Sequence, residues 1–360
     1  MIYIDYNATT PIVPCARAAM IEAFDCLGNP SSVHGHGRET RKILENSREQ
    51  VASYFDVPAR NVTFTSGATE ANNLIIKGFK GAVLVSAVEH DSVLKIRNDV
   101  TIIPVDEHGV VELEALEKLV APNTLVCVLA VNNETGVIQP IAEILQICKK
   151  HNAHLHVDAA QAVGKTRIDW ATLPSFTISA HKFGGPKGIG AIIINQPINL
   201  SALIEGGGQE RGLRAGTENI IGAVGMGAAL SAFDFDWNTL QPLQQRLEAG
   251  ILKVCPQATI FGKNANRVAN TTSIAMPNVS SEVQLMHFDL HNISISAGSA
   301  CSSGKVKTSH VLTAMGIPKE VAKCAIRIST GWTTTENDID QCIAVWAELF
   351  KTQHTKRGIA

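Results

Sequence analysis

The sequence predicts an α/β protein with a mostly parallel sheet covered by helices. Runs rich in β-branched residues alternate with amphipathic stretches of helical length, which is the pattern of repeated strand–helix–strand units. Hydrophobic residues make up 45% of the chain and charged residues 18%, which excludes intrinsic disorder and allows a large buried core. A length of 360 residues favours two domains.

The expected elements follow one another in regular order. Strands are expected near residues 61–65, 82–87, 100–104, 124–130 and 153–158, and helices near residues 68–80, 112–120 and 139–151. After a helix near residues 218–233, a long helical stretch at 238–254 leads into a pattern typical of a smaller α+β unit. We therefore place a domain boundary near residue 235.

Charge and cysteine usage exclude several classes of protein. Lys+Arg number 31 against 33 Asp+Glu, so a net charge of −2 predicts neither a nucleic-acid partner nor a membrane surface. The opening residues lack a signal-peptide pattern, and no apolar run reaches the roughly 18 residues of a membrane span. The 8 cysteines are spread thinly without a CxxC pair, which favours a reducing compartment, and we expect the cytoplasm.

The segment after the first strand offers an anion site. Ligands of open parallel sheets bind beyond the carboxyl ends of the strands, so chemistry is expected there. Residues 66–70 combine a glycine turn with the start of a helix, where backbone N–H groups and the Thr69 hydroxyl can hold a phosphate. A plain helix N-cap explains the same segment, so this signal is not decisive alone.

Two further strand ends carry polar side chains. His90, after the strand at 82–87, could stack on a ring or move protons, and a purely structural role is equally compatible. The apolar run at 125–131 ends in a polar cluster in which turn chemistry accounts for Asn132 and Gly136. It does not account for Asn133.

A carboxylate and a lysine stand at the next strand ends. The strand at 153–158 puts His154, His156 and Asp158 on one face, which could bind a metal or present one carboxylate to a cofactor cation. Lys182 ends a strand among small residues and glycines, a setting that lowers an amine pKa and suits a Schiff base, whereas Lys187 fits an exposed lysine better. Phosphate site, carboxylate and lysine together match pyridoxal 5′-phosphate.

One cysteine differs from the others in its surroundings. Residues 294–304 surround Cys301 with small polar residues, which predicts an accessible loop where the thiol can ionise and carry sulfur. Cys127, Cys148 and Cys342 lie in apolar or helical segments and are expected to pack in the interior.

Motifs in order along nearly the whole chain resemble those of the NifS/IscS-like cysteine desulfurases, class V aminotransferase relatives that use pyridoxal phosphate. They are DYNATTP (5–11), GNPSSVH (28–34), TSGATE (65–70), VNNETG (131–136), HVDAAQ (156–161), SAHK (179–182), RAGTEN (214–219), GSACSSG (298–304) and RISTG (327–331). The resemblance implies an aspartate-aminotransferase-like fold, with a mostly parallel seven-stranded sheet in a large domain, residues 12–235. Residues 1–11 and 236–360 would form a smaller α+β domain.

The same resemblance implies a catalytic set. Lys182 would hold the cofactor, Asp158 would pair with its pyridine nitrogen, and Gln161 would bond its phenolic oxygen. His90 would stack on the ring and carry protons, and Cys301 would accept sulfur as a persulfide.

It also implies binding residues. The phosphate would be bound by Ala68, Thr69, Ser179, His181 and, from the neighbouring subunit of a homodimer, Thr217. Asn133 would lie by the substrate and the cofactor, and Arg327 would bind the substrate carboxylate, a task that suits a bidentate guanidinium.

The expected reaction converts L-cysteine to L-alanine and passes sulfur to an acceptor protein for iron–sulfur cluster assembly or another thiolation. Residues 303–309 are more basic than the family pattern and the tail at 351–360 looks shorter, which leaves the acceptor open. A selenocysteine lyase or another class V relative is the main alternative. A metal hydrolase on His154, His156 and Asp158, or a non-catalytic scaffold, leaves Lys182 and Cys301 unexplained.

Overall fold

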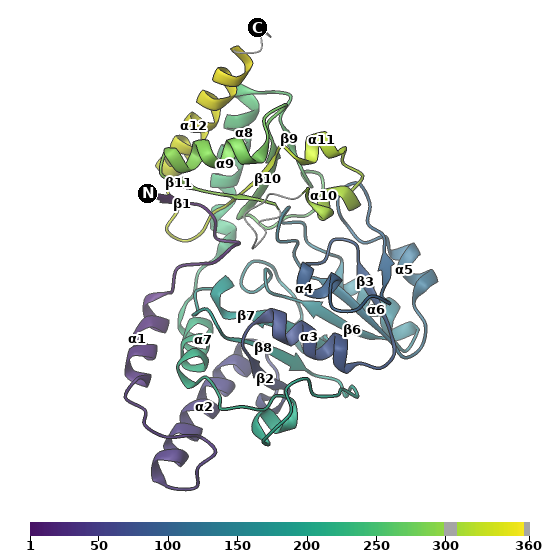
Figure 1. Ribbon diagram of the computed structural model, residues 1–360, viewed down its shortest axis with the longest axis vertical. Helices are drawn as coiled ribbons and strands as arrows, with labels where there is room; N and C mark the ends of the chain where they lie inside the picture. Colours follow the sequence, from purple (N-terminus) through teal and green to yellow (C-terminus); the bar gives the residue numbers. More distant parts are fainter. Residues whose placement is uncertain (299–307, 356–360) are drawn as a thin grey trace.

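A computed structural model describes residues 1–298 and 308–355 of the chain (Figure 1). Its larger sheet has seven strands in the order β2-β8-β7-β6-β5-β3-β4. Their bounds are β2 (Val62–Thr65), β3 (Ala82–Ser86), β4 (Thr101–Ile103), β5 (Thr124–Leu129), β6 (His154–Asp158), β7 (Ser175–Ser179) and β8 (Gly190–Ile194). The strands from β7 to β4 pair in parallel, and β8 runs antiparallel to both its neighbours. The predicted class, α/β with a mostly parallel sheet, is confirmed.

Helices cover both faces of this sheet. They are α1 (Pro14–Ala23), α2 (Gly35–Tyr54), α3 (Ala68–Gly78), α4 (Asp91–Leu94), α5 (Leu113–Leu119), α6 (Ile141–Lys150) and α7 (Ile220–Ala232). Val83 and Val85 of β3 pack in one apolar cluster with Leu74 of α3, whereas Leu84 between them packs in another cluster with Leu44 of α2. Side chains that alternate between two apolar clusters explain why the central strands are apolar throughout.

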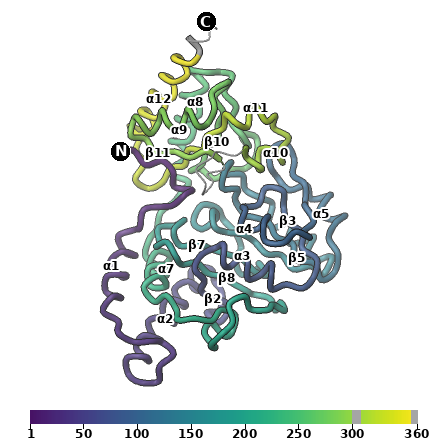
Figure 2. Tube along the Cα trace, viewed as in Figure 1, coloured from purple at the N-terminus to yellow at the C-terminus, as the bar shows by residue number. Residues whose placement is uncertain are grey.

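A smaller sheet stands above the large one in Figures 1 and 2. It has the antiparallel order β12-β13-β10-β9, and a separate parallel pair joins β1 to β11. The strands are β1 (Ile2–Tyr3), β9 (Thr259–Ile260), β10 (Thr271–Ala275), β11 (Ile293–Ser294), β12 (Ser296–Ala297) and β13 (Ala325–Ser329). The helices of this part are α8 (Gln241–Val254), α9 (Ser281–Leu290), α10 (His310–Ala314), α11 (Lys319–Ala322) and α12 (Glu336–Thr355). Ile4 shares an apolar cluster with Trp346, so the N-terminal segment packs with the C-terminal part of the chain. The domain division at residue 235 stays a prediction.

The expected elements agree with the structure to within a few residues. One differs: the helical stretch expected at 238–254 begins as a 3₁₀ turn, Trp237–Leu240, and only then becomes α8. Pro242 lies in the first turn of α8, where its missing N–H costs no helical hydrogen bond, so the α-helix starts there. Further 3₁₀ turns are Ala59–Asn61, Trp170–Thr172, Ala180–Lys182 and Gln209–Gly212.

In the part of the chain that the structure describes, no helix by itself has the length and apolar character needed to cross a membrane. One pair of segments reaches the required length and apolar composition only when taken together, and the two are bent by 78° relative to each other: Ile220–Ala232 and Trp237–Val254.

A buried ion pair fastens the edge strand β2. The Arg48 guanidinium donates to both Glu210 carboxylate oxygens, at 2.7 and 2.9 Å, and to the Val62 carbonyl at 2.9 Å. The Phe64 backbone N–H donates to the same carboxylate at 3.0 Å. The two charged side chains are only 3% and 1% exposed, so helix α2, strand β2 and the turn before α7 depend on one desolvated carboxylate.

Removing that carboxylate should destabilise the fold strongly. Glu210→Ala removes the buried counter-ion of Arg48, which keeps only the Val62 carbonyl and the more exposed Glu45 as acceptors, and it leaves the Phe64 N–H without an acceptor. We expect a loss of about 3–5 kcal/mol in the free energy of unfolding. Urea denaturation at one protein concentration measures it. The control is Asp340→Ala, which removes the acceptor of the exposed Arg246 pair and should change little. Equal losses in the two variants would contradict the importance of the buried pair.

Candidate active site

One cavity of about 630 Å³ lies at the carboxyl ends of the parallel strands, with a wall formed by the smaller sheet. Its volume suits a small ligand. Ten of the residues expected at the site line it: Ala68, Thr69, His90, Asn133, Asp158, Gln161, Ser179, His181, Lys182 and Arg327. Thr217 is exposed and is not among the lining residues, and Cys301 lies outside the described residues.

Lys182 follows β7 in a short 3₁₀ turn and reaches into the cavity. Its Nζ donates to the backbone carbonyls of Asn7, at 2.6 Å, and Ala8, at 3.0 Å. Burial, and then the nearby Arg327 charge, lower the pKa of Lys182 to about 8. A substantial fraction of the amine is thus neutral at moderately alkaline pH. Lys187 also lines the cavity but is exposed, in line with the sequence expectation.

Asp158 ends strand β6 and is held by two N–H donors. The Ala160 backbone N–H donates to one carboxylate oxygen at 2.9 Å, and the Asn72 side chain donates to the other at 2.8 Å. Asn72, on helix α3, was missed by the sequence analysis. Its Oδ1 lies 3.3 Å from Nε2 of His156, whose pKa burial lowers to about 3, so neutral His156 can donate to Asn72. The polar side chain inside the apolar helix run at 71–76 was the available signal.

The metal interpretation of this strand finds no support in the geometry. His154 and His156 both contact the Ser175 hydroxyl, at 2.9 and 3.0 Å. Across residues 1–298 and 308–355, they form no three-ligand cluster with Asp158. The histidines are the polar surroundings of one carboxylate, which is the second interpretation that the sequence left open.

His90 caps helix α4 with its ring. Nδ1 accepts from the Ser92 backbone N–H at 3.0 Å and lies 2.8 Å from the Ser92 hydroxyl, which itself accepts from Asn72 at 3.0 Å. Neutral His90 therefore carries its proton on Nε2. Burial lowers the pKa of His90, and the nearby Asp158 charge opposes that shift. The same Asn72 amide thus contacts both Asp158 and the Ser92 hydroxyl that orients His90.

The start of helix α3 forms an anion cradle. Gly67 precedes the helix, no side chain caps its first turn, and Glu70 folds back to accept from the Ser66 N–H at 2.8 Å. The free N–H groups at a helix N-terminus attract a phosphate. A Cβ on Gly190 would lie 2.6 Å from the Ile178 carbonyl and 2.8 Å from Cα of Gly67, so only glycine lets β8 pass behind this turn.

His181 stands beside this cradle. Its Nδ1 lies 3.2 Å from the Thr9 hydroxyl, and burial followed by the Lys182 and Lys187 charges lowers its pKa to about 4. A neutral His181 can donate one hydrogen bond to a phosphate without adding a charge.

A buried lysine fixes the amide of Gln161. Lys165 Nζ donates to Gln161 Oε1 at 2.8 Å and to Asn7 Oδ1 at 3.3 Å, and the Gln161 amide nitrogen donates to the Asn7 carbonyl at 2.9 Å. Since the Asn7 backbone carbonyl can only accept, it sets which end of the Gln161 amide is nitrogen, and the amide oxygen then faces Lys165. One N–H of Gln161 then remains for a ligand. Asn7 and Lys165 were missed, because nothing in the local pattern of either segment indicates that they meet.

Arg327 is held at the cavity wall by the N-terminal segment. Its guanidinium donates to the Asp5 carboxylate at 2.8 Å and to the Asn133 carbonyl at 3.0 Å, while its buried Nε has no hydrogen-bond partner. Asp5 also accepts from the Ser296 hydroxyl at 2.8 Å. This arrangement orients a cation and leaves it a donor for a carboxylate.

The residues present fit pyridoxal 5′-phosphate. An uncapped helix start can take its phosphate, Asp158 can face a protonated ring nitrogen, and Gln161 can donate to the phenolic oxygen. Lys182 offers a partly desolvated amine in the same cavity. The donors thus match the cofactor's groups one by one.

The remaining cysteines behave as expected of packing residues. Cys127, Cys148 and Cys342 are buried, and burial raises the pKa of Cys148 and Cys342 to about 12 and that of Cys127 well above its usual range. None of these three thiols is suited to nucleophilic chemistry.

Comparison with known proteins agrees with this site. Residues 2–342 match the aminotransferase class-V family. The cysteine desulfurase IscS of Dictyoglomus turgidum is 36% identical over 98% of this chain and 95% of its own length, and the cysteine desulfurase of Sinorhizobium fredii is 38% identical over 99% and 98%. The X-ray structure of a NifS-like protein from Rickettsia africae superposes with a TM-score of 0.90 at 38% identity, covering 98% of this chain and 99% of that one. The chain therefore belongs to the aminotransferase class-V family, among relatives named as cysteine desulfurases.

Proposed function

We propose that this protein is a pyridoxal-phosphate-dependent cysteine desulfurase, which converts L-cysteine to L-alanine and retains the sulfur as a protein persulfide. The observation that carries this proposal is the convergence of Lys182, Asp158 and the uncapped start of α3 on one cavity. Full-length similarity to cysteine desulfurases supports the substrate.

Several polar groups of the cavity would hold the cofactor. Ala68 and Thr69 at the start of α3, with Ser179 and His181, would bind the phosphate, and Lys182 would supply the amine of the covalent link. When bound, pyridoxal phosphate withdraws electrons from the amino acid joined to it and so acidifies the Cα–H bond. The Asp158 carboxylate stabilises the positive ring nitrogen on which this withdrawal depends.

Protons move through Lys182 and His90. Once the substrate amine has replaced it, the neutral Nζ of Lys182 accepts the Cα proton, and a pKa near 8 makes that amine available at modest pH. His90 carries its proton on Nε2 and can deliver it within the cavity. Arg327 and Asn133 fix the substrate, with Arg327 binding the carboxylate.

We assign the sulfur step to Cys301 from its sequence context. Its thiolate attacks the substrate sulfur, so an S–S bond forms as the Cβ–S bond breaks. The electron pair of the broken bond stays with the carbon skeleton, whose Cβ gains the proton that the attacking thiol lost. Alanine leaves, and the persulfide passes to an acceptor protein for iron–sulfur cluster assembly or another thiolation.

Two further points belong to the proposal. In the described part of the chain Cys15, Cys26, Cys127, Cys148, Cys255 and Cys342 are free thiols, which supports a reducing compartment, and we propose the cytoplasm. Thr217 is exposed and does not line the cavity of its own subunit, which is compatible with a role in the phosphate site of a second subunit.

Replacing Lys182 tests the cofactor assignment. Lys182→Ala should abolish the visible absorbance of lysine-bound cofactor and lower alanine formation by about 10³-fold or more, since both the covalent link and the base are lost. Lys187→Ala is the matched control, because Lys187 also lines the cavity, and it should keep the absorbance. Loss of absorbance in the control alone would reassign the lysine.

The pH dependence of cofactor capture is a second readout of the same residue. Only the neutral amine attacks the cofactor aldehyde, so a lowered pKa moves the gain in rate to lower pH. With a pKa of about 8, the capture rate of cofactor-free protein should rise roughly tenfold per pH unit below 8 and level off above it. A rate still rising nearly tenfold per unit at about pH 9 would show an ordinary lysine.

Replacing Cys301 separates carbon chemistry from sulfur chemistry. Cys301→Ser should still bind the cofactor and respond to cysteine with a change in visible absorbance, but alanine formation should fall to background, because a hydroxyl attacks sulfur poorly. The matched control is Cys342→Ala, which should cost at most a few kcal/mol of stability and leave turnover of the folded enzyme intact. Wild-type release of alanine and sulfide by Cys301→Ser would exclude this thiol as the nucleophile. Parallel assays with selenocysteine distinguish a selenocysteine lyase.

Mixed subunits test the proposed homodimer. In a dimer of one Lys182→Ala and one Thr217→Val subunit, both defects should fall in one site and leave the other near normal, so about half of the wild-type activity remains. Light scattering of the active enzyme provides the check on mass. An active monomer rules out the exchange of Thr217.

A further inference from the structure

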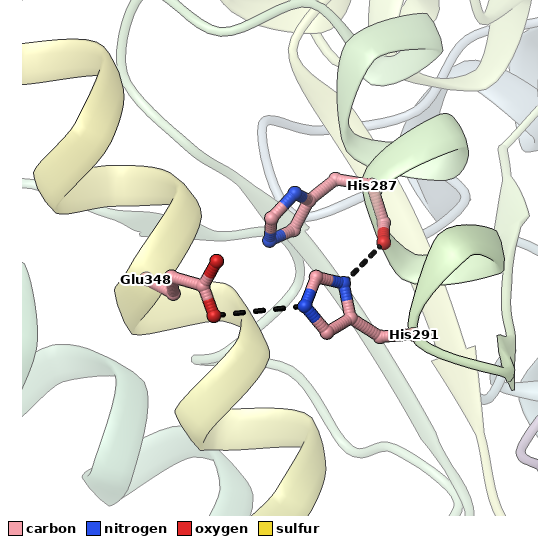
Figure 3. Close-up of side chains that lie close together, drawn as sticks. All are labelled: His287, His291 and Glu348. Carbon is pink, nitrogen blue, oxygen red and sulfur yellow. Dashed lines mark hydrogen bonds and ion pairs between the residues drawn. The ribbon is translucent and has the colours of Figure 1, made fainter.

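A cluster of three ligand-type side chains lies outside the active site, between helices α9 and α12 (Figure 3). His287 and His291 stand one helical turn apart at the C-terminal end of α9, and Glu348 projects from α12. One nitrogen or oxygen atom from each residue lies within 4.8 Å of the others. Neither the sequence motifs nor the proposed function uses any of the three.

The hydrogen bonding of His291 leaves a lone pair facing a carboxylate. Its Nδ1 lies 2.8 Å from the His287 backbone carbonyl, which can only accept, so Nδ1 carries the proton. In the neutral ring, Nε2 is then an acceptor, and it lies 3.6 Å from Glu348 Oε2. Two acceptors face each other across this gap, an arrangement that a shared cation satisfies.

His287 adds a third atom that lacks a hydrogen-bond partner. Its Nε2 is buried and has no hydrogen-bond partner, which is rare for a buried polar atom. In Figure 3 the rings of His287 and His291 lie next to each other, and the Glu348 carboxylate lies opposite both. The centroids of the two rings are 4.4 Å apart.

The two helices hold these side chains on a fixed base. Phe288 of α9 and Val345, Trp346 and Leu349 of α12 are neighbours of the three residues in sequence, and all four pack in one buried apolar cluster. A Zn²⁺ ion with ligands at about 2.0–2.2 Å needs ligand atoms about 3.4 Å apart. The 3.6 Å between His291 Nε2 and Glu348 Oε2 is close to this distance. A modest rotation of the side chains would bring the His287 atom, which lies within 4.8 Å of the other two, to the same distance.

We propose that His287, His291 and Glu348 form a Zn²⁺ site that links α9 to α12, with water as the fourth ligand. Two imidazoles and one carboxylate suit Zn²⁺, whereas Mg²⁺ and Ca²⁺ prefer oxygen ligands alone. The Glu348 and His291 side chains are 60% and 36% exposed, which gives the ion a path and leaves room for the water. The Nδ1 contact of His291 with a backbone carbonyl is the usual support of a metal-bound histidine.

Zinc titration of the chelator-treated holoenzyme tests this site. The wild-type chain should bind one Zn²⁺ with micromolar or tighter affinity, and His287→Ala and Glu348→Gln should each weaken that binding at least tenfold. The matched control is His151→Ala, which removes a histidine that also lies beside a glutamate, Glu117, at 3.7 Å but has no second histidine, and it should bind as the wild type does. Desulfurase activity without zinc should be the same in all four proteins.

Two readouts separate this site from thiols and from misfolding. The Co²⁺ form should lack the intense thiolate charge-transfer band that cysteine ligation produces. Zinc should raise the Tm of the wild type and leave that of His287→Ala and Glu348→Gln unchanged, and Glu348→Gln preserves the shape of a largely exposed side chain, so its folding is not at risk. Equal zinc affinity in the wild type and these variants, or a thiolate spectrum in the wild type, would overturn the proposal.

Discussion

The site depends on one buried asparagine. The Asn7 backbone carbonyl accepts from Lys182 and from Gln161, at 2.6 and 2.9 Å. The rest of the residue faces the smaller sheet, where its amide donates to the Thr271 hydroxyl and its N–H donates to the Ser329 hydroxyl, both at 2.9 Å. A single residue near the N-terminus thereby joins the ends of the large sheet to the wall that closes the cavity. Asn7 is only 2% exposed, so its backbone and side chain satisfy these groups away from water.

Desolvation sets the charges of the cavity. The pKa of Lys182 falls to about 8 and those of His181 and His156 to about 4 and 3, in each case with burial as the largest cause. Burial acts against every charged form, so a charge survives only where donors are arranged for it. Asp158 has such donors in Ala160 and Asn72. The same desolvation thus keeps His181 and His156 neutral and makes the neutral amine of Lys182 accessible at moderately alkaline pH.

Sequence reasoning located those cavity residues whose place follows from the end of a strand. Lys182 and Asp158 are strand-end residues of a parallel sheet, and the topology alone brings such ends together. It failed where function follows from contacts between distant segments: Asn72, Asn7 and Lys165 act through partners on other elements, and no local periodicity encodes those pairings. The domain limits and the roles of Thr217 and Cys301 stay predictions, because the described residues of one chain do not test them. They came from the ordered motifs that resemble those of cysteine desulfurases, since the spacing of residues alone does not predict them.

The pairing of β1 with β11 sets the order in which the molecule can be completed. Residues 2–6 find their partners, Asn292 and Ser294 at β11 and Ser329 on β13, only after those distant segments have been made. Until then the carbonyl that receives Lys182 has no fixed place, and the nascent large sheet carries an unfinished pocket. Closing so long a loop costs conformational entropy, which the contacts of the finished cavity must offset. A chain that stops before β13 therefore lacks the Ser329 hydroxyl that holds Asn7, and its cavity lacks a fixed acceptor for Lys182.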